Sequence, residues 1–476
     1  MNTNASLNNN RENKRSNVLA EIVEYKKSVV AQRKHERPLE SFKKRLVKST
    51  RSLEKALSNS RSDFILECKK ASPSKGLIRK DFNLADILDC YKDYASAISI
   101  LTDEKYFQGD LNYIAEATAR VKQPILCKDF FIDPYQVFEA RYFGADAILL
   151  MLSVLTDDEY KALAEIAESL SLDVLTEVHD EQEAERAQKL GAKIIGINNR
   201  DLRDLSIDLA TTEKIAPVIA KNTPNAIIIS ESGVETHQDI KRLKPYADGF
   251  LIGSSIMAEN DLRYHCKKLL FGNVKICGLT RKSDAIAVDA NGANYGGLIF
   301  YPPSPRFVTL DVAREIVSAA PLRYVGVFVN EALQVMVDTA KALDLYAVQL
   351  HGNESQTTIL DLRKLLDCNG LKYTKIWKAI HVESNATFQS QEAVDRYLLD
   401  KFDPAIFGGT GQKFDWSLLD SVDTSELILA GGINHQNLAD LGQYSPYAID
   451  LSSSVESAPG IKSEEKIETL FSALRA

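Results

Sequence analysis

The sequence predicts two consecutive (β/α)8 barrels of the TIM type, the first preceded by an extra helix, and three observations lead to this fold class. Short apolar runs alternate with longer, charged amphipathic stretches, which is the pattern of strand–helix units around a parallel sheet. The apolar runs fall into two consecutive sets of eight. The chain has 476 residues, more than one hydrophobic core usually organises. An open doubly wound sheet would more often have about five or six strands and a single Gly-rich fingerprint.

An extra helix is expected before the first strand. Residues 1–16 are polar and rich in Asn, so we expect a flexible extension there. The stretch that follows has the spacing of an amphipathic helix, with Leu19, Ile22 and Val29 on its apolar face, and it ends before Pro38. The first barrel therefore begins with an element that a plain (β/α)8 barrel lacks.

The two barrels are predicted to span residues 17–271 and 272–476. The strands of the first are expected at residues 64–68, 97–102, 124–130, 147–152, 173–178, 194–198, 226–230 and 249–254. Those of the second are expected at residues 273–279, 295–300, 323–329, 347–350, 373–380, 396–400, 427–431 and 447–452. Gly272 suits a short linker at the boundary.

The last two strands of each set are followed by turns rich in Gly and Ser. Loops after strands 7 and 8 of such barrels commonly hold a phosphate, because glycine lets the backbone approach an anion and N–H groups at the start of a short helix point at it. A single Ser–Gly pair would be an ordinary turn, but the arrangement occurs in both halves. The candidate phosphate-binding residues are Gly233, Gly253 and Ser254 in the first half and Gly431, Gly432, Ser452 and Ser453 in the second, to which the Gly-rich turn after the sixth strand of the second half adds Gly409 and Gly411.

Polar residues stand at the carboxyl ends of predicted strands in the first half, where barrel enzymes carry their catalytic groups. Two Lys and three Glu would meet at one mouth, namely Glu67, Lys69, Lys128, Glu177 and Glu231. Each alone has an ordinary explanation, since such a Lys usually extends to water and such a Glu usually lies on a solvated face. Together they should shift each other's pKa values, which can prepare a Lys as proton donor and a Glu as acceptor. Further polar residues stand at the same rim: Ser72 after the first strand, Asn198 and Arg200 at the end of the sixth, and Ser232 after the seventh.

Different groups stand at the strand ends of the second half. Cys277 lies in the first predicted strand, Arg306 follows the second in "PPSPR", and Asp400 ends the sixth. A thiol opposite a carboxyl group could supply base and acid for a proton shift. A single Cys is more often buried filler, so the assignment depends on the motifs around it.

The motif series of the first half resembles indole-3-glycerol phosphate synthase, in order, in "LECKKASPSKG", "PILCKDFFID", "LTEVHDE", "IGINNRDL", "SESGV" and "ADGFLIGSSIM". The resemblance implies that Lys128 is the general acid of ring closure and Glu177 the general base. It implies that Phe107 and Phe130 contact the aromatic ring of the substrate, and that the N-terminal helix lies across the mouth. The other catalytic groups would be Glu67, Lys69 and Asn198, and Ser72, Arg200, Glu231 and Ser232 would bind the substrate. The division of roles between the two lysines stays open.

The second half resembles phosphoribosylanthranilate isomerase in "KICGLTR", "VQLHGNE", "GGTGQKFDW", "LAGGIN" and "DLSSSVESAPGIK". The resemblance implies that Cys277 is the general base and Asp400 the general acid. Asp403 is the alternative acid, because "KFDPAIF" departs locally from the family pattern. Arg306 would receive the anthranilate carboxylate, for which a planar guanidinium is suited. Asp450 would bind sugar hydroxyls.

A synthase followed by an isomerase in one chain resembles the bifunctional enzymes of tryptophan biosynthesis. The second domain would isomerise N-(5-phosphoribosyl)anthranilate to 1-(2-carboxyphenylamino)-1-deoxyribulose 5-phosphate, and the first would close the indole ring with loss of CO2 and water. Neither reaction needs a metal or an organic cofactor. Two alternatives are another phosphosugar isomerase, whose histidine-pathway relatives use two Asp where this chain has Cys277 and Asp400, and a non-catalytic phosphosugar-binding or scaffold protein.

Composition limits the partners and the location. The 58 Lys and Arg against 66 Asp and Glu give a net charge of −8, which argues against nucleic acid. No apolar stretch reaches the roughly 18 to 20 residues of a membrane span and the polar N-terminus has no signal-peptide core, so we expect a cytoplasmic protein that binds no membrane. The six cysteines lack the close pairs of a zinc or redox site. Small phosphosugars are the expected partners, and a monomer is expected because two barrels in one chain can bury surface against each other.

Overall fold

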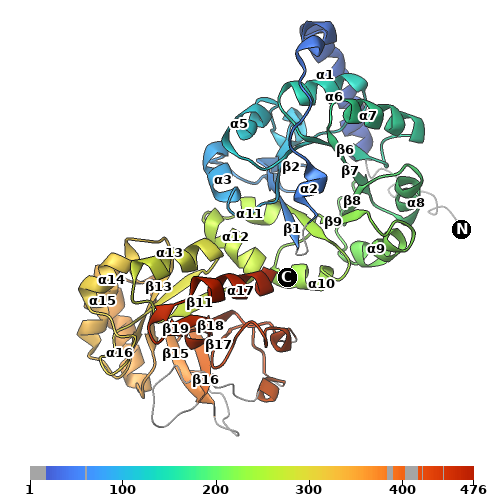
Figure 1. Ribbon diagram of the computed structural model, residues 1–476. Coiled ribbons are helices and arrows are strands. Elements are labelled where there is room, and N and C mark those ends of the chain that lie inside the picture. Colours follow the sequence, from blue (N-terminus) through green and yellow to red (C-terminus); the bar gives the residue numbers. More distant parts are fainter. Residues whose placement is uncertain are drawn as a thin grey trace, which may run out of the picture. The chain divides into compact units, whose positions relative to one another are not determined.

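The chain folds into two closed barrels. The computed structural model describes residues 18–58, 62–382, 390–401, 416–420, 422–442 and 444–475. The chain divides into two compact units, residues 1–266 and 267–476. Each contains a closed barrel of eight parallel strands, so the predicted fold class is confirmed (Figure 1). The division falls inside helix α12 (Leu262–Phe271), on the N-terminal side of the boundary that the sequence suggests.

The strands of the first barrel coincide with the predicted apolar runs to within a few residues. Their bounds are β1 Asp63–Cys68, β4 Ala97–Leu101, β5 Ile125–Lys128, β6 Ala147–Met151, β7 Asp173–Val178, β8 Ile194–Asn198, β9 Ile227–Glu231 and β10 Gly249–Ile252. Most of their residues are buried, as expected of parallel strands covered on both faces. Strand β1 pairs with both β4 and β10, which closes the ring. A small hairpin, β2 (Ala71–Ser72) and β3 (Gly76–Leu77), follows β1.

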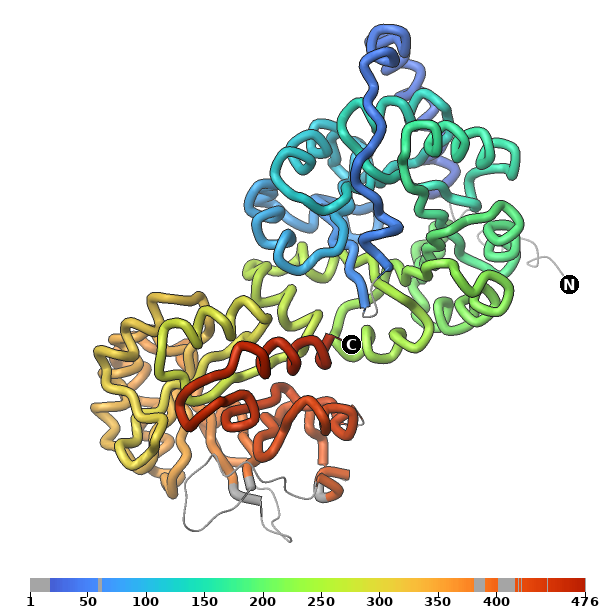
Figure 2. The backbone as a smooth tube through the Cα atoms, in the orientation of Figure 1, coloured from blue at the N-terminus to red at the C-terminus, as the bar shows by residue number. Residues whose placement is uncertain are grey.

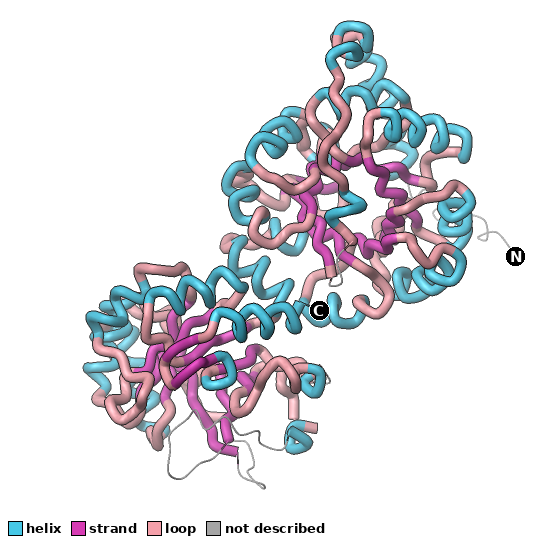
Figure 3. The backbone as a smooth tube through the Cα atoms, in the orientation of Figure 1, coloured by secondary structure: helices cyan, strands magenta, loops and turns pink. Residues whose placement is uncertain are grey.

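Helices alternate with these strands and surround the ring, as Figure 3 shows in cyan around magenta. Their bounds are α1 Val18–Glu36, α2 Leu53–Ala56, α3 Leu84–Tyr91, α4 Glu104–Phe107, α5 Asn112–Arg120, α6 Pro134–Tyr142, α7 Asp157–Ser169, α8 Glu181–Lys189, α9 Ala210–Asn222, α10 His237–Leu243 and α11 Ser254–Met257, with 3-10 helices η1 Leu39–Ser41 and η2 Lys43–Arg45. Side chains cap many of the helices. Thr156 accepts a hydrogen bond from the N–H of Glu159, and the Glu159 carboxylate accepts one from the N–H of Thr156 in return.

The second barrel repeats the arrangement, and the chain passes round each ring in sequence order (Figure 2). Its strands are β11 Val274–Cys277, β12 Tyr295–Ile299, β13 Arg323–Phe328, β14 Ala347–Leu350, β15 Lys375–Val382, β16 Arg396–Lys401, β17 Leu427–Leu429 and β18 Ala448–Leu451. Its helices are α13 Lys282–Asn291, α14 Leu310–Val317, α15 Leu333–Leu343, α16 Gln356–Cys368 and α17 Glu464–Arg475. A hairpin of β19 (Glu456–Ala458) and β20 (Ile461–Lys462) precedes the last helix.

Short 3-10 helices replace α-helices late in the second barrel. They are η3 Trp416–Leu419 after β16, η4 Ala439–Leu441 after β17 and η5 Ser453–Val455 after β18. The segment between β17 and β18 contains several Gly and Asn residues and a Pro, which are weak helix formers. No helix of the described residues is both long and apolar enough to cross a bilayer.

Helix α1 packs on the first barrel through a face that includes a charged residue. Its buried residues are Leu19, Ile22, Lys26 and Val30. They are spaced three or four positions apart and therefore share one side of the helix. Val29, expected on the apolar face, is only partly buried, because Lys26 and Val30 occupy the side of the helix that faces the barrel.

Candidate active sites

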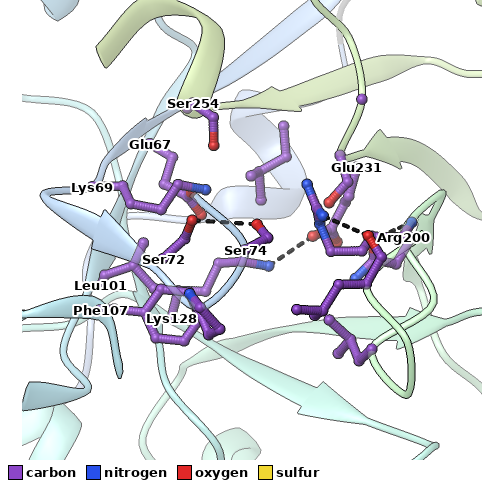
Figure 4. A pocket seen from close by; sticks show the side chains of 18 of the residues that line it. Glu67, Lys69, Ser72, Ser74, Leu101, Phe107, Lys128, Arg200, Glu231 and Ser254 are labelled. Carbon is purple, nitrogen blue, oxygen red and sulfur yellow. Dashed lines mark hydrogen bonds and ion pairs between the residues drawn. The ribbon is translucent and has the colours of Figure 1, made fainter. Parts of the chain in front are cut away.

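A pocket lies at the carboxyl ends of the strands of the first barrel (Figure 4). All of the residues that the sequence predicts for this site line it: Glu67, Lys69, Ser72, Phe107, Lys128, Phe130, Glu177, Asn198, Arg200, Glu231, Ser232, Gly233, Gly253 and Ser254. Helix α1 contributes Val18, Leu19 and Ile22 to the same lining. The helix that precedes the barrel is therefore part of the wall of its mouth.

Lys128 lies among the carboxylates of this pocket. Its Nζ is 2.7 Å from Oε2 of Glu231 and 3.4 Å from Oε2 of Glu177. Lys69 forms a separate pair, with its Nζ 2.5 Å from Oε1 of Glu67. The two lysines therefore have different partners, and the ion pair to the predicted base, Glu177, is made by Lys128.

Burial and charge act in opposite directions on the pKa values of this cluster. Burial alone would lower the pKa of Lys128, but the carboxylates of Glu231, Glu177 and Glu67 outweigh it and hold that pKa above its ordinary value. Burial raises the pKa of Glu231 to about 7, although the ammonium of Lys128 opposes the shift. Lys128 is therefore protonated at neutral pH and can donate a proton, while Glu231 changes its charge near pH 7.

The backbone at the predicted phosphate turns of the first barrel has conformations and close contacts that favour glycine. Ser232 and Gly233 have φ values of 65° and 85°, in the left-handed region. A Cβ at Gly253 would lie 2.6 Å from Oε1 of Glu67, so a larger residue would displace that carboxylate. Ser254 follows at the start of α11. The chain thus passes close to the charged groups of the pocket at this turn.

A second pocket lies at the carboxyl ends of the strands of the second barrel. Eight of the predicted residues line it: Cys277, Arg306, Asp400, Gly431, Gly432, Asp450, Ser452 and Ser453. Gly409, Gly411 and the alternative acid Asp403 lie outside the described residues. Within the described ranges no group of three or more His, Cys, Asp or Glu side chains is arranged to hold a metal ion.

Cys277 shares the interior of the second barrel with a buried ion pair. Lys275 is fully buried two residues earlier on β11, and its Nζ is 2.7 Å from Oδ2 of Asp450 on the neighbouring strand β18. Burial raises the pKa of the Cys277 thiol, and the positive charge of Lys275 opposes that shift. The thiol is therefore the main form at neutral pH, and Lys275 favours its conversion to the thiolate.

Arg306 is already paired within the protein. Its Nε and Nη2 donate to the two carboxylate oxygens of Glu456, at 2.9 and 2.8 Å. Lys462 also contacts Glu456, with its Nζ 2.9 Å from Oε1, and donates to the carbonyl of Cys277 at 2.6 Å. The family resemblance implies that Arg306 binds a substrate carboxylate. Glu456 binds one edge of the Arg306 guanidinium, and the two N–H groups of Nη1 lie outside that pair.

Asp400 lies on β16 beside a histidine. Its Oδ2 is 3.8 Å from Nε2 of His351, and Nδ1 of that ring is 3.2 Å from Nε2 of Gln349. Gln349 and His351 belong to the motif "VQLHGNE", for which the sequence alone predicts no chemical role. Both also line the pocket, so the surroundings of the predicted acid come from β14 as well as β16.

Two family models match the chain, one for each barrel. The model described as "Indole-3-glycerol phosphate synthase" matches residues 19–269, and the model described as "N-(5'phosphoribosyl)anthranilate (PRA) isomerase" matches residues 274–473. The chain belongs to both of these families. The first barrel is therefore the synthase barrel and the second the isomerase barrel.

Relatives cover the two barrels together. The chain is 49% identical over 465 residues to "Tryptophan biosynthesis protein TrpCF" of Vibrio parahaemolyticus serotype O3:K6 (strain RIMD 2210633), covering 98% of this chain and 95% of the relative. It is 49% identical to the protein of that name from Salmonella typhi, covering 96% and 99%. Phosphoribosyl anthranilate isomerase from Thermus thermophilus is 33% identical, with a TM-score of 0.38, covering 42% of this chain and 98% of that one. The prediction of a bifunctional enzyme of tryptophan biosynthesis is confirmed.

Several residues that contact the lining of the two pockets were not foreseen from the sequence. Asn199 donates to the carbonyls of Glu231 and Ser232, both at 3.0 Å, and so holds the turn after β9. A Cβ at Gly196 would lie 2.0 Å from Oε1 of Glu231, so this glycine makes room for the carboxylate. In the isomerase barrel, a Cβ at Gly297 would lie 2.7 Å from Sγ of Cys277. Such close approaches have no signature in one sequence, because the partner strand is not known in advance.

Proposed function

We propose that each barrel carries out the reaction of its family with its own acid and base. The observation that supports this is the separation of two sets of proton-transfer groups. Lys128 and Glu177 line the pocket of the synthase barrel, whereas Cys277 and Asp400 line the pocket of the isomerase barrel. Each pocket also contains the Gly and Ser turns expected to hold a phosphate. One phosphorylated substrate would therefore bind in each barrel.

The isomerase barrel would act first, on N-(5-phosphoribosyl)anthranilate. Asp400 protonates the ring oxygen of the sugar, so that the C–O bond breaks and the anthranilate nitrogen forms an imine with C1. The thiolate of Cys277 then removes the proton on C2, and the enol that forms becomes the ketone of 1-(2-carboxyphenylamino)-1-deoxyribulose 5-phosphate. Individual acid or base groups typically contribute about 100-fold to 10,000-fold to such steps.

The remaining groups of the isomerase pocket would hold the substrate. The free edge of Arg306 binds the anthranilate carboxylate while Glu456 fixes the orientation of the guanidinium. Asp450 accepts hydrogen bonds from sugar hydroxyls and at the same time holds Lys275 beside the thiol. The phosphate binds at the turns of Gly431, Gly432, Ser452 and Ser453, and Gly409 and Gly411 belong to the same proposal.

The synthase barrel would close the indole ring of that product. The protonated Lys128 donates its proton to the ketone oxygen as the aromatic carbon that bears the carboxylate attacks the ketone carbon. CO2 then leaves, which restores the aromatic ring, and Glu177 assists the loss of water. Glu231 lies 2.7 Å from Lys128 and keeps its ammonium in place. The product is indole-3-glycerol phosphate.

Other residues of the synthase pocket would bind and orient this substrate. Phe107 and Phe130 contact its aromatic ring, and their own ring centroids are 6.2 Å apart. The phosphate binds at Gly233, Gly253 and Ser254, and Ser232 makes a further contact with the substrate. Further polar contacts to the sugar chain and the carboxylate come from Glu67, Lys69, Ser72, Asn198 and Arg200.

The limits of the domains, the oligomeric state and the location are also proposals. We assign residues 17–271 to the synthase domain and 272–476 to the isomerase domain, which fits the gap between the two family matches. We expect a monomer, which sedimentation would test. We expect the cytoplasm as its location, because all six cysteines are free thiols and a reducing compartment keeps them so.

Fluorescence tests the proposed function directly. Anthranilate derivatives and indole products emit differently, so purified protein given N-(5-phosphoribosyl)anthranilate should show loss of the anthranilate signal and formation of indole-3-glycerol phosphate. A protein that binds the phosphosugar and releases it unchanged would contradict the proposal. A protein that stops at the deoxyribulose intermediate would contradict the assignment of the synthase barrel.

A further inference from the structure

Helix α1 of the synthase barrel carries a lysine that is buried between two carboxylates. Nζ of Lys26 is 2.8 Å from Oδ2 of Asp103 and 2.6 Å from Oδ1 of Asp129. The Lys26 side chain is 1% exposed, and those of Asp103 and Asp129 are 0% and 3% exposed. Burial alone would lower the pKa of Lys26, but the two carboxylates outweigh it and hold that pKa above its ordinary value. The cluster is therefore a charged one, shielded from water.

Both carboxylates belong to segments that carry an aromatic residue of the pocket. Asp103 caps α4 by accepting a hydrogen bond from the N–H of Tyr106 at 2.7 Å, and α4 ends at Phe107. Asp129 directly follows Lys128 and accepts a hydrogen bond from the N–H of Phe130 at 2.8 Å. A single ammonium group thus joins α1 to the two segments that present Phe107 and Phe130.

The same helix adds apolar side chains beside these rings. Leu19 and Ile22 of α1 belong to one core cluster with Phe130, and Phe107 packs against that cluster. All four residues line the synthase pocket. The apolar wall is therefore assembled from three separate segments, and its shape depends on how those segments are held together.

We propose that Lys26 is a positioning residue of the synthase reaction, because its ammonium fixes α1, the α4 turn and the segment after Lys128 as one wall for the aromatic ring of the substrate. This inference rests on the proposed ring closure in the first barrel. Lys26 would not touch the substrate. It would act through Phe107 and Phe130, and through the position of Lys128, the residue before Asp129.

Attachment of α1 does not depend on Lys26 alone. Arg33 pairs with Glu104 at 3.1 Å and with Glu139 at 3.3 Å, and the rings of Tyr25 and Tyr106 meet edge to face with centroids 5.8 Å apart. These contacts lie further along the helix or on another side of it. Removal of the Lys26 charge should therefore leave the helix attached while the wall beside Lys128 loses its common anchor.

Lys26→Met in the full chain tests the proposal, with Lys27→Met as the matched control. Lys27 is the next residue of α1, and its side chain is 62% exposed. We expect Lys26→Met to raise KM for the carboxyphenylamino-deoxyribulose phosphate and to lower synthase kcat/KM by about 100-fold, the order of loss that a small misplacement of reacting groups produces. Lys27→Met should resemble the native protein, and the isomerase activity of each variant serves as the internal standard.

Asp103→Asn provides a second test if Lys26→Met fails to fold. Asn retains the oxygen that caps α4 but removes one of the two charges facing Lys26. We expect KM to rise in this variant too, but by a smaller factor than in Lys26→Met. A variant that unfolds at lower temperature but keeps the native KM and kcat per folded molecule would show that the cluster only stabilises the fold, and would overturn the proposal. Absence of synthase activity in the native protein would instead contradict the proposed function.

Discussion

Lys128 and Glu231 are 103 positions apart in the sequence, yet the barrel brings the ammonium of the first within 2.7 Å of the carboxylate of the second. Glu231 is buried and Lys128 is partly buried in the synthase pocket, and a second carboxylate, that of Glu177, lies 3.4 Å from the same nitrogen. Lys128, between two carboxylates, can pass a proton to the substrate while the carboxylates themselves remain ionised. Its behaviour with pH follows from this arrangement.

The synthase reaction should respond to the titration of Glu231. The pKa of this buried carboxyl is raised to about 7, so it is protonated below that pH and ionised above it. Below pH 7, Lys128 loses one of its two carboxylate partners, and we expect synthase kcat/KM to fall between about pH 8 and about pH 6. In Glu231→Gln no charge changes at this position, so the profile should lose its step near pH 7. A step that persists in the variant would show that another group titrates.

Each activity should be removable without the other. Lys128→Ala deletes the proposed acid of ring closure, and Cys277→Ser replaces the proposed base of the isomerisation by a much weaker one. Each change should reduce its own reaction by at least about 100-fold and leave the other within twofold, as measured by separate assays on the two substrates. If either variant lost both activities while its circular dichroism stayed native, the assignment of one reaction to each barrel would be wrong.

Gly253→Ala should damage the synthase through the carboxylate of Glu67. The added Cβ would lie 2.6 Å from Oε1 of Glu67, so the carboxylate or the phosphate turn must move. We expect synthase kcat/KM to fall by about 100-fold with unchanged isomerisation. Gly191→Ala is the control, because a Cβ there meets nothing within 4 Å, although its φ of 74° adds some strain. Equal losses in the two variants would mean that strain in the fold, and not the contact with Glu67, is responsible.

The barrels and the strand-end residues were predictable because their signals are local. Buried parallel strands appear in the sequence as apolar runs. Because the carboxyl ends of these strands lie at one rim of the barrel, Lys128 and Glu177 could be placed together without knowing any distance. The Gly-rich turns were predictable for the same reason, since glycine at the end of a strand marks a close approach of the backbone.

Two buried ion pairs away from the predicted proton-transfer groups were not predictable. Lys26 lies in a helix that is rich in charge, where a lysine normally reaches water, and its burial depends on Asp103 and Asp129 arriving from distant segments. Glu456 lies beyond the last phosphate turn, and nothing in its neighbourhood in the sequence indicates a pair with Arg306, 150 positions earlier. Both depend on tertiary contacts that a periodic pattern does not encode.

The kcat/KM of the isomerase should increase as the pH rises, and Lys275 should determine the pH at which this increase occurs. Burial raises the pKa of Cys277 above its ordinary value of 9.0, although Lys275 opposes the shift, so only a small fraction is thiolate at pH 7. If the thiolate is the base, kcat/KM should rise about tenfold per pH unit between about pH 7 and about pH 9. Lys275→Met removes the opposing charge, which should raise the thiol pKa further and move the profile to higher pH.

The same shift can be read without turnover, from the rate at which iodoacetamide alkylates Cys277 at each pH, because the thiolate is the reactive form. Lys282→Met is the control, since Lys282 forms an exposed pair with Glu315 on the outside of the same barrel. Alkylation of the native protein should accelerate at lower pH than that of Lys275→Met, and Lys282→Met should match the native protein. A Lys275→Met profile that coincides with the native one in both measurements would exclude Lys275 as the group that favours the thiolate. The buried pair with Asp450 would then serve stability alone.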